Sequence, residues 1–81
     1  MAREITDSTF ISAVKYTYKE KGRAVTSNEV VAELLRRRKE KPSWFARRII
    51  NFEAANTLDE LYRKRKIRQI IKNRTVYYMP L

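Results

Sequence analysis

The sequence predicts a small α+β domain in which three helices, or four, are followed by a C-terminal β-hairpin. Apolar residues recur at helical spacing as far as Tyr62, and the final stretch is β-branched and aromatic on both sides of a short polar turn. The chain has 81 residues, which is enough for one hydrophobic core and too few for two. We therefore treat residues 1–81 as a single domain.

The first helix is expected to be capped by Asp7 or Ser8, because either side chain can cap a helix N-terminus. Its apolar residues at helical spacing are Phe10, Ile11, Val14 and Tyr18. Gly22 is the only glycine in the chain and fits the left-handed position just past a helix end. Residues 23–25 leave room for no more than a connector or a brief strand.

The second helix has the clearest start. Thr26 and Glu29 have the spacing of a capping box, and Val25 and Val30 occupy the positions of a hydrophobic staple. The buried stripe of this helix is expected to consist of Val30, Val31, Leu34 and Leu35. The helix then runs into the basic segment 36–39.

A third helical stretch is expected from about Trp44, with Pro42 as the stop and Ser43 as the new cap. At 100° per residue, one side of this helix carries Phe45, Ile49 and Phe52. The opposite side carries Trp44, Arg47, Arg48 and Asn51.

The later residues of this stretch complicate a single straight helix. Leu58 and Leu61 fall nearer the polar side, so an unbroken helix would be apolar on both faces. Thr57 and Glu60 also have the spacing of a capping box. We therefore favour a break near residues 55–57, and the alternative is one long helix buried on both sides.

The last stretch has the composition of β-strands. Residues 67–71 and 75–79 are rich in β-branched and aromatic side chains, and the segment 72–74 separates them. Asn73 is the residue best able to adopt a positive φ, so the stretch predicts a hairpin whose second strand ends at Pro80.

The positive charge is concentrated in the second half of the chain. The whole chain has 19 basic and 9 acidic residues, a net charge of +10. Residues 1–35 hold five basic and five acidic residues, whereas residues 36–81 hold fourteen basic and four acidic ones. This segregation indicates a face that binds a polyanion, for which nucleic acid is the usual partner.

The residue types that are absent exclude several functions. The chain has no cysteine and no histidine, which removes the thiol nucleophile, the zinc finger and the commonest general base. One glycine cannot build a phosphate-binding loop, and no two carboxylates are spaced as an acid–base pair. We expect a protein that is not an enzyme and that binds no cofactor, no metal and no evident small-molecule ligand.

The sequence also bears on the cellular setting. No apolar run approaches the length of a membrane span and no signal-peptide stretch follows Met1. We therefore expect a cytoplasmic protein with no membrane partner, or one in the host cytoplasm if it is viral. The Lys, Arg, Ile and Tyr content, with one glutamine, suits a thermophile such as an archaeon or its virus.

Two motifs resemble the winged helix-turn-helix family of archaeal, bacterial and viral DNA-binding proteins. The first runs through Leu58-x-x-Leu61, Lys66-Ile67 and Arg74-Thr75-Val76-Tyr77-Tyr78, and looks like the end of a recognition helix followed by both wing strands. The second, Val25–Ala32, is similar to the start of the helix before the turn. Members usually have glycine just before the wing, where this chain has Arg65, and a shorter connection than the one from Leu35 to Leu58.

The resemblance implies a recognition helix in the major groove and a wing on the flanking backbone of double-stranded DNA. Family spacing counted from Leu58 would direct Phe52 and Asn56 toward the groove. Side-chain chemistry instead favours Arg47, Arg48 and Asn51, which suit guanine, phosphate and adenine, and we follow the chemistry. The expected DNA-binding residues are Arg36, Arg37, Arg38, Lys39, Lys41, Ser43, Arg47, Arg48, Asn51, Lys72, Asn73 and Arg74.

Most aromatic side chains are expected in the core rather than on a base-stacking surface. They are Phe10, Phe45, Phe52, Tyr62, Tyr77 and Tyr78. Trp44 is expected to close the core beneath Pro42.

Together these features predict a sequence-specific transcriptional regulator that binds duplex DNA as a homodimer. The dimer contact is expected on the first helix or on the face of Phe45, Ile49 and Phe52. Three alternatives stay open: a non-specific architectural DNA-binding protein, an RNA- or ribosome-binding winged helix, and an adaptor that meets an acidic protein.

Overall fold

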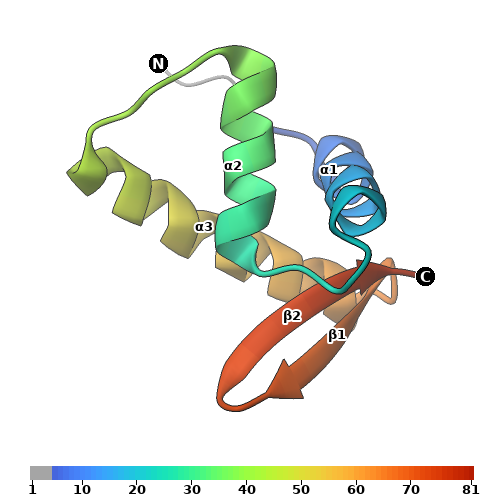
Figure 1. Cartoon of the computed structure of the whole chain (residues 1–81). Helices are drawn as coiled ribbons and strands as arrows, with labels where there is room; N and C mark the ends of the chain where they lie inside the picture. The colour runs from blue at the N-terminus through green and yellow to red at the C-terminus, as the bar shows by residue number, and fades with distance from the viewer. Residues whose placement is uncertain (1–4) are drawn as a thin grey trace.

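The computed structural model describes residues 5–81 and has the expected α+β architecture (Figure 1). Its elements are α1 (Asp7–Lys21), α2 (Ser27–Arg38), α3 (Trp44–Arg63), β1 (Ile67–Lys72) and β2 (Thr75–Pro80). The prediction of helices followed by a C-terminal antiparallel hairpin is confirmed, with three helices rather than four. The layout is compatible with that of a winged helix.

The start of α2 follows the predicted capping box. Thr26 Oγ1 accepts a hydrogen bond from the backbone N–H of Glu29 (3.3 Å), and Glu29 Oε1 accepts one from the backbone N–H of Thr26 (3.0 Å). Ser43 caps α3 as predicted, and Gly22 ends α1 in the left-handed conformation with φ 70°. These local signals determine where the helices begin and end.

The start of α1 differs from the prediction by one residue. Thr6, not Asp7 or Ser8, is the cap, and its hydroxyl accepts a hydrogen bond from the backbone N–H of Thr9 (3.2 Å). Asp7 is the first helical residue, where its negative charge suits the helix dipole.

α3 is one unbroken helix of 20 residues, so the expected break near residues 55–57 is wrong. Ala54 and Leu58 are buried on one continuous stripe, and this burial is retained only if the helix continues from one to the other. Thr57 does not cap a new helix, because its hydroxyl donates to the carbonyl oxygen of Glu53 (3.1 Å). A helix of this length spans about 30 Å.

The aromatic side chains of α3 are exposed, which corrects the expectation that they lie in the core. The exposed fractions are 73% for Trp44, 63% for Phe45, 68% for Phe52 and 42% for Tyr62. The stripe from Ala54 to Leu61 faces the core and turns these side chains outward. Phe10 and Tyr78 are buried as predicted, and Tyr77 is half-buried.

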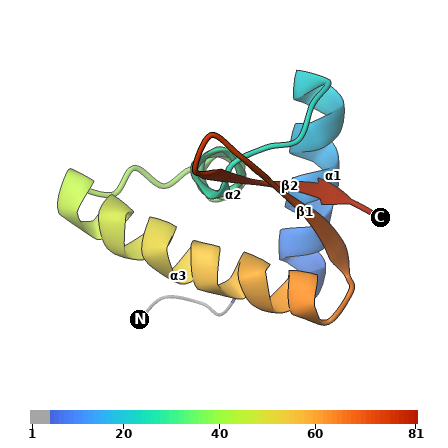
Figure 2. The ribbon, with the colours of Figure 1, turned by 90° about the horizontal axis from the view of Figure 1, so that it is seen from below.

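The core lies where the helices and the hairpin meet. It consists of Phe10, Ala13, Val14, Val25, Val30, Val31, Leu34, Leu35, Ala54, Leu58, Leu61, Ile67 and Tyr78, so the predicted stripe of the second helix is confirmed. Figure 2 shows α2 and the hairpin on one side of α3, whereas no described element covers its opposite side. No helix formed by residues 5–81 is long and apolar enough to cross a membrane.

The hairpin is tied to the connection between α1 and α2. Its register runs from the pair Ile67–Pro80 to the pair Lys72–Thr75, which leaves a two-residue turn. Val25 forms an isolated antiparallel bridge with Tyr78 through backbone hydrogen bonds of 2.8 and 2.6 Å. The base of the two-stranded hairpin is therefore tied to the α1–α2 connection, and its turn extends into solvent.

Candidate nucleic-acid interface

The basic residues at the end of α2 are paired with an acidic one. Arg36 and Arg37 both donate to Glu33, whose side chain is only 6% exposed, at 2.8 and 2.7 Å. Arg37 also donates to the hydroxyl of Ser12 on α1 (3.4 Å), and both guanidinium groups lie 5.8 Å from the centre of the Tyr16 ring. The hydrogen bond from Arg36, and secondly that from Arg37, lowers the pKa of Glu33. These two arginines hold α2 against α1.

The connection between α2 and α3 carries cations that, unlike these two arginines, have no acidic partner among residues 5–81. The side chains of Lys39 and Lys41 are exposed and make no hydrogen bond or ion pair with residues 5–81. Arg38, in the last turn of α2, is half-buried. Ser43 Oγ accepts the backbone N–H of Ala46 (3.2 Å), so its cap role leaves the hydroxyl proton to donate elsewhere.

The structure separates the four residues predicted to share a polar face of α3. Arg47 and Asn51 are half-buried on the side that continues into Ala54, and neither Arg47 Nε nor Asn51 Oδ1 has solvent contact or a partner in residues 5–81. Arg48 and Trp44 lie on another side, where they line a hollow with exposed apolar residues. The expectation that Arg47, Arg48 and Asn51 are exposed together on one face is wrong for Arg47 and Asn51, because the core stripe fixes the rotation of the helix.

The tip of the hairpin presents three polar side chains. Lys72, Asn73 and Arg74 are all exposed, and Lys72 and Arg74 have no ion pair within the described chain. Asn73 adopts φ 51°, as predicted, and Arg74 adopts φ 65°. Two consecutive positive φ values define the type I′ turn, in which glycine is the preferred second residue.

Three cations thus occupy backbone positions that favour glycine. Lys39, Arg65 and Arg74 have φ values of 56°, 62° and 65°. This left-handed region costs a residue with a Cβ atom about 1–2 kcal/mol. Lys39 ends α2 and Arg65 follows α3, both common positions for glycine. Only at Arg65 does the sequence contain a signal for this strain, because the resembled family usually has glycine there. The positions of Lys39 and Arg74 carry no such signal.

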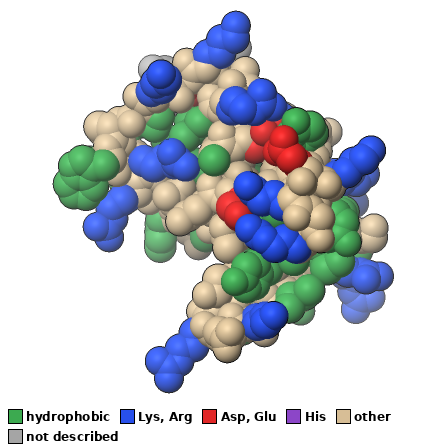
Figure 3. Space-filling view, in the orientation of Figure 1, with side chains coloured by type: hydrophobic (Ala, Val, Ile, Leu, Met, Phe, Trp, Pro, Cys, Tyr) green, Lys and Arg blue, Asp and Glu red, His purple; other side chains and the backbone are tan. Residues whose placement is uncertain are grey.

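The unpaired cations of the connection and of the hairpin tip lie toward the same side of the molecule. In Figures 1 and 2 the hairpin turn points in the direction in which α3 begins, and residues 39–43 enter α3 at that end. Figure 3 shows Lys and Arg side chains along the upper, left and right margins of this face and at the hairpin tip. The acidic side chains visible there lie near α2, which carries Glu29 and Glu33.

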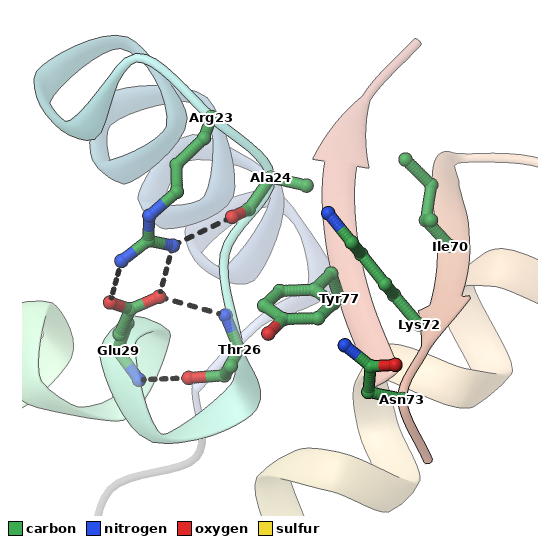
Figure 4. A pocket seen from close by; sticks show the side chains of 8 residues that line it. All are labelled: Arg23, Ala24, Thr26, Glu29, Ile70, Lys72, Asn73 and Tyr77. Carbon is green, nitrogen blue, oxygen red and sulfur yellow. Dashed lines mark hydrogen bonds and ion pairs between the residues drawn. The ribbon is translucent and has the colours of Figure 1, made fainter. Parts of the chain in front are cut away.

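A hollow of 610 Å³ lies between the α1–α2 connection and the hairpin (Figure 4). On one side Arg23 donates to both oxygens of Glu29 (3.0 and 2.7 Å) and to the carbonyl of Ala24 (2.8 Å). The hydrogen bond from Arg23 is the main cause that lowers the pKa of Glu29 to about 2. Lys72 lies on the other side of the Tyr77 ring. The hollow therefore contains one internal ion pair and one unpaired cation.

No known protein family, curated protein or solved structure shows significant similarity to this chain. Among residues 5–81, no three acidic, histidine or cysteine side chains are grouped as ligands for a metal ion. The arrangement of the cations is therefore the basis for a functional proposal.

Proposed function

We propose that this is a winged-helix protein that binds double-stranded DNA. Its binding surface would comprise the α2–α3 connection, the first turns of α3 and the hairpin turn. One observation carries the proposal: four cations without an acidic partner among residues 5–81 lie on two loops directed to the same side of the molecule. These cations are Lys39, Lys41, Lys72 and Arg74.

The backbone conformation of two of these cations supports the proposal. Lys39 and Arg74 stand in left-handed positions where glycine would be less strained. A cation there adds charge, hydrogen-bond donors and reach, and it lowers the stability of the fold. Strain of this kind is typical of functional positions, and phosphate oxygens are the ligands that such side chains bind best.

The first turns of α3 lie between the two loops and fit a recognition helix. An α-helix with its side chains is about 10–12 Å wide, which matches the width of the major groove. Arg48 is exposed, whereas Arg47 and Asn51 are half-buried and would have to swing outward to reach a base edge. In a sequence-specific complex these three residues read the bases, while the loops hold phosphates.

The partial burial of Arg47 and Asn51 favours a second candidate function. A helix with few exposed base-reading groups suits a non-specific architectural protein, which holds DNA through phosphates alone. Selection from random duplexes, followed by sequencing, separates the two. A transcriptional regulator enriches a defined site and binds it at least about 1,000-fold more tightly than random DNA, whereas an architectural protein enriches none.

Fluorescence anisotropy with a labelled duplex tests DNA binding itself. If about five phosphates are neutralised, the slope of log affinity against log salt is near −4.5. Lys72→Ala flattens this slope by about one unit for every sequence, whereas Lys15→Ala, an exposed cation on α1, leaves it unchanged. A slope between zero and −1 contradicts the proposal, and so does structured RNA that displaces the duplex more effectively than unlabelled DNA of equal length.

A further inference from the structure

The outward side of α3 carries an apolar patch that no described element covers. Its members are Trp44, Phe45, Ile49 and Phe52, whose exposed fractions range from 47% to 73%. The Trp44 and Phe45 rings meet edge to face with centroids 6.2 Å apart, and the four side chains with Arg48 line a hollow of 350 Å³. A contiguous exposed patch of large apolar side chains marks an interaction surface.

The charge of α3 gives a polyanion no special affinity for this patch. The helix has three arginines and three carboxylates, and so a net charge of zero in a chain of charge +10. These residues are Arg47, Arg48, Arg63, Glu53, Asp59 and Glu60. At the patch itself Arg48 is the only described charged residue that lines the hollow and Glu53 lies beside it, so phosphates find no row of donors here. An apolar surface with one charge of each sign fits the patch better.

The patch has the residue spacing of a coiled-coil seam. Phe45, Ile49, Phe52 and Asn56 follow one another at intervals of four, three and four residues, the pattern d, a, d, a of a heptad repeat. Ala54 and Leu61 lie on the opposite side of the helix, buried in the protein's own core. Isoleucine and a single asparagine at a positions are features of parallel two-stranded coiled coils.

The charges beside the seam favour the same orientation. Arg48 is at g and Glu53 is at e, and both are exposed with no ion pair within residues 5–81. In a parallel pair, a g side chain meets the e side chain five residues further along the other helix, so Arg48 meets Glu53 twice. An antiparallel pair centred on the patch would bring the two Arg48 side chains together instead.

We infer that a second copy of this chain covers the patch, in a homodimer whose α3 helices pair in parallel through residues 45–56. The inference concerns the free protein. Because Arg48 and the first turns of α3 belong to both surfaces, the dimer and the proposed base-reading complex are alternative states of α3. Trp44 falls at position c, at the margin of the seam, so the other three apolar side chains of the patch supply most of the contact from each copy. Their burial removes about 800–900 Å² from water, the size of a weak or transient interface. We therefore expect a dissociation constant in the micromolar range.

Sedimentation equilibrium of the full chain measures this constant. Phe52→Glu, at an exposed position, should raise it at least roughly tenfold, because a charge replaces a buried ring on both copies. Ile71→Glu is the matched control, since Ile71 is also 68% exposed but lies on β1, and it should leave the constant unchanged. Circular dichroism checks that both variants fold. A wild-type protein that remains monomeric at about 100 μM overturns the inference.

Disulfide cross-linking tests the orientation, since the natural chain has no cysteine. In the parallel pair, Asn56→Cys places two thiols side by side, and mild oxidation should convert most of the protein to a covalent dimer. In an antiparallel pair centred on the patch, the two positions lie about 20 Å apart and cannot be bridged. Ile71→Cys should stay monomeric on a non-reducing gel. Absence of the Asn56→Cys dimer in a sample that sedimentation shows to be dimeric overturns the parallel arrangement.

Discussion

Arg23 and Glu29 form a two-point ion pair at the start of α2, with Nη1···Oε1 3.0 Å and Nη2···Oε2 2.7 Å. The same carboxylate accepts the backbone N–H of Thr26, so Glu29 both caps α2 and fixes the α1–α2 connection. Val25, in that connection, exchanges two backbone hydrogen bonds with Tyr78. The position of the hairpin therefore depends on the chemistry of a short loop more than 40 residues before it in the sequence.

This ion pair predicts a loss of stability in acid. Folding lowers the pKa of Glu29 from 4.5 to about 2, mainly through the hydrogen bond from Arg23. The unfolded chain then takes up the proton first as pH falls, so the stabilisation is complete above about pH 4.5 and is lost toward pH 2. Because the pair is partly exposed, Glu29→Gln should lower the free energy of unfolding at pH 7 by about 1 kcal/mol.

Thermal unfolding of the wild type and of Glu29→Gln between pH 2 and pH 7 checks this prediction. The difference between the two proteins should vanish as pH approaches the lowered pKa of Glu29, about 2. A difference that stays constant over the whole range would show that the charge of Glu29 does not stabilise the fold.

Glu33 predicts opposite effects on stability and on binding. Its buried carboxylate accepts hydrogen bonds from Arg36 and Arg37, so Glu33→Gln should lower the free energy of unfolding by about 1–3 kcal/mol. The substitution also releases both arginines and removes a negative charge, so duplex affinity should rise. Denaturant unfolding and anisotropy measure the two effects. Duplex affinity that does not rise in a variant that remains folded would place Arg36 and Arg37 away from the DNA.

Local signals were enough to predict most of the fold. The capping box of Thr26 and Glu29 and the positive φ of Asn73 depend on residues adjacent in sequence, and both are confirmed. The rotation of α3 could not be predicted in the same way, because the helix is apolar on two sides. Only packing against α2, β1 and α1 decides that Leu58 turns inward and Phe52 outward.

The candidate site was less predictable for the same reason. The spacing of Glu33 with Arg36 and Arg37 indicates from the sequence that these residues can form ion pairs. The burial of Glu33 between two helices cannot be read from the sequence. The conformations of Lys39 and Arg74 depend on how α2 ends and on a turn of two residues, whereas the sequence favoured a turn of three.

Asn51 distinguishes the regulator from the architectural protein. If it reads a base edge, Asn51→Ala should weaken binding to a selected site by about 1–3 kcal/mol and binding to random duplex by less. The free energy of unfolding should not fall, because Asn51 Oδ1 is buried without a partner among residues 5–81. Its removal therefore leaves no other group unsatisfied. Anisotropy on both duplexes and a thermal melt check this. Intact binding to the selected site would contradict the role of Asn51 in base reading.

We propose that Lys39 and Arg74 occupy strained left-handed positions, where glycine would be more stable, because their positive charges bind DNA phosphates. Arg74 at the hairpin turn and Arg65 after α3 have almost the same left-handed conformation, with φ 65° and 62°. They lie at different places, because Arg65 follows the end of α3 opposite to the one that the connection enters. Glycine at either position relieves strain and removes one positive charge, so the two variants are matched in everything except location.

The most direct measurement is therefore the pair Arg74→Gly and Arg65→Gly, each examined for thermal stability and for duplex affinity at one salt concentration. Both substitutions should raise the free energy of unfolding by about 0.5–1 kcal/mol. This is the strain energy relieved in the left-handed conformation minus the extra conformational entropy that glycine loses on folding. Only Arg74→Gly should weaken duplex binding, by about tenfold, with a salt slope flatter by about one unit. If both variants are more stable and bind DNA equally well, the strained cation at the hairpin tip has no role in DNA binding, and the account is contradicted.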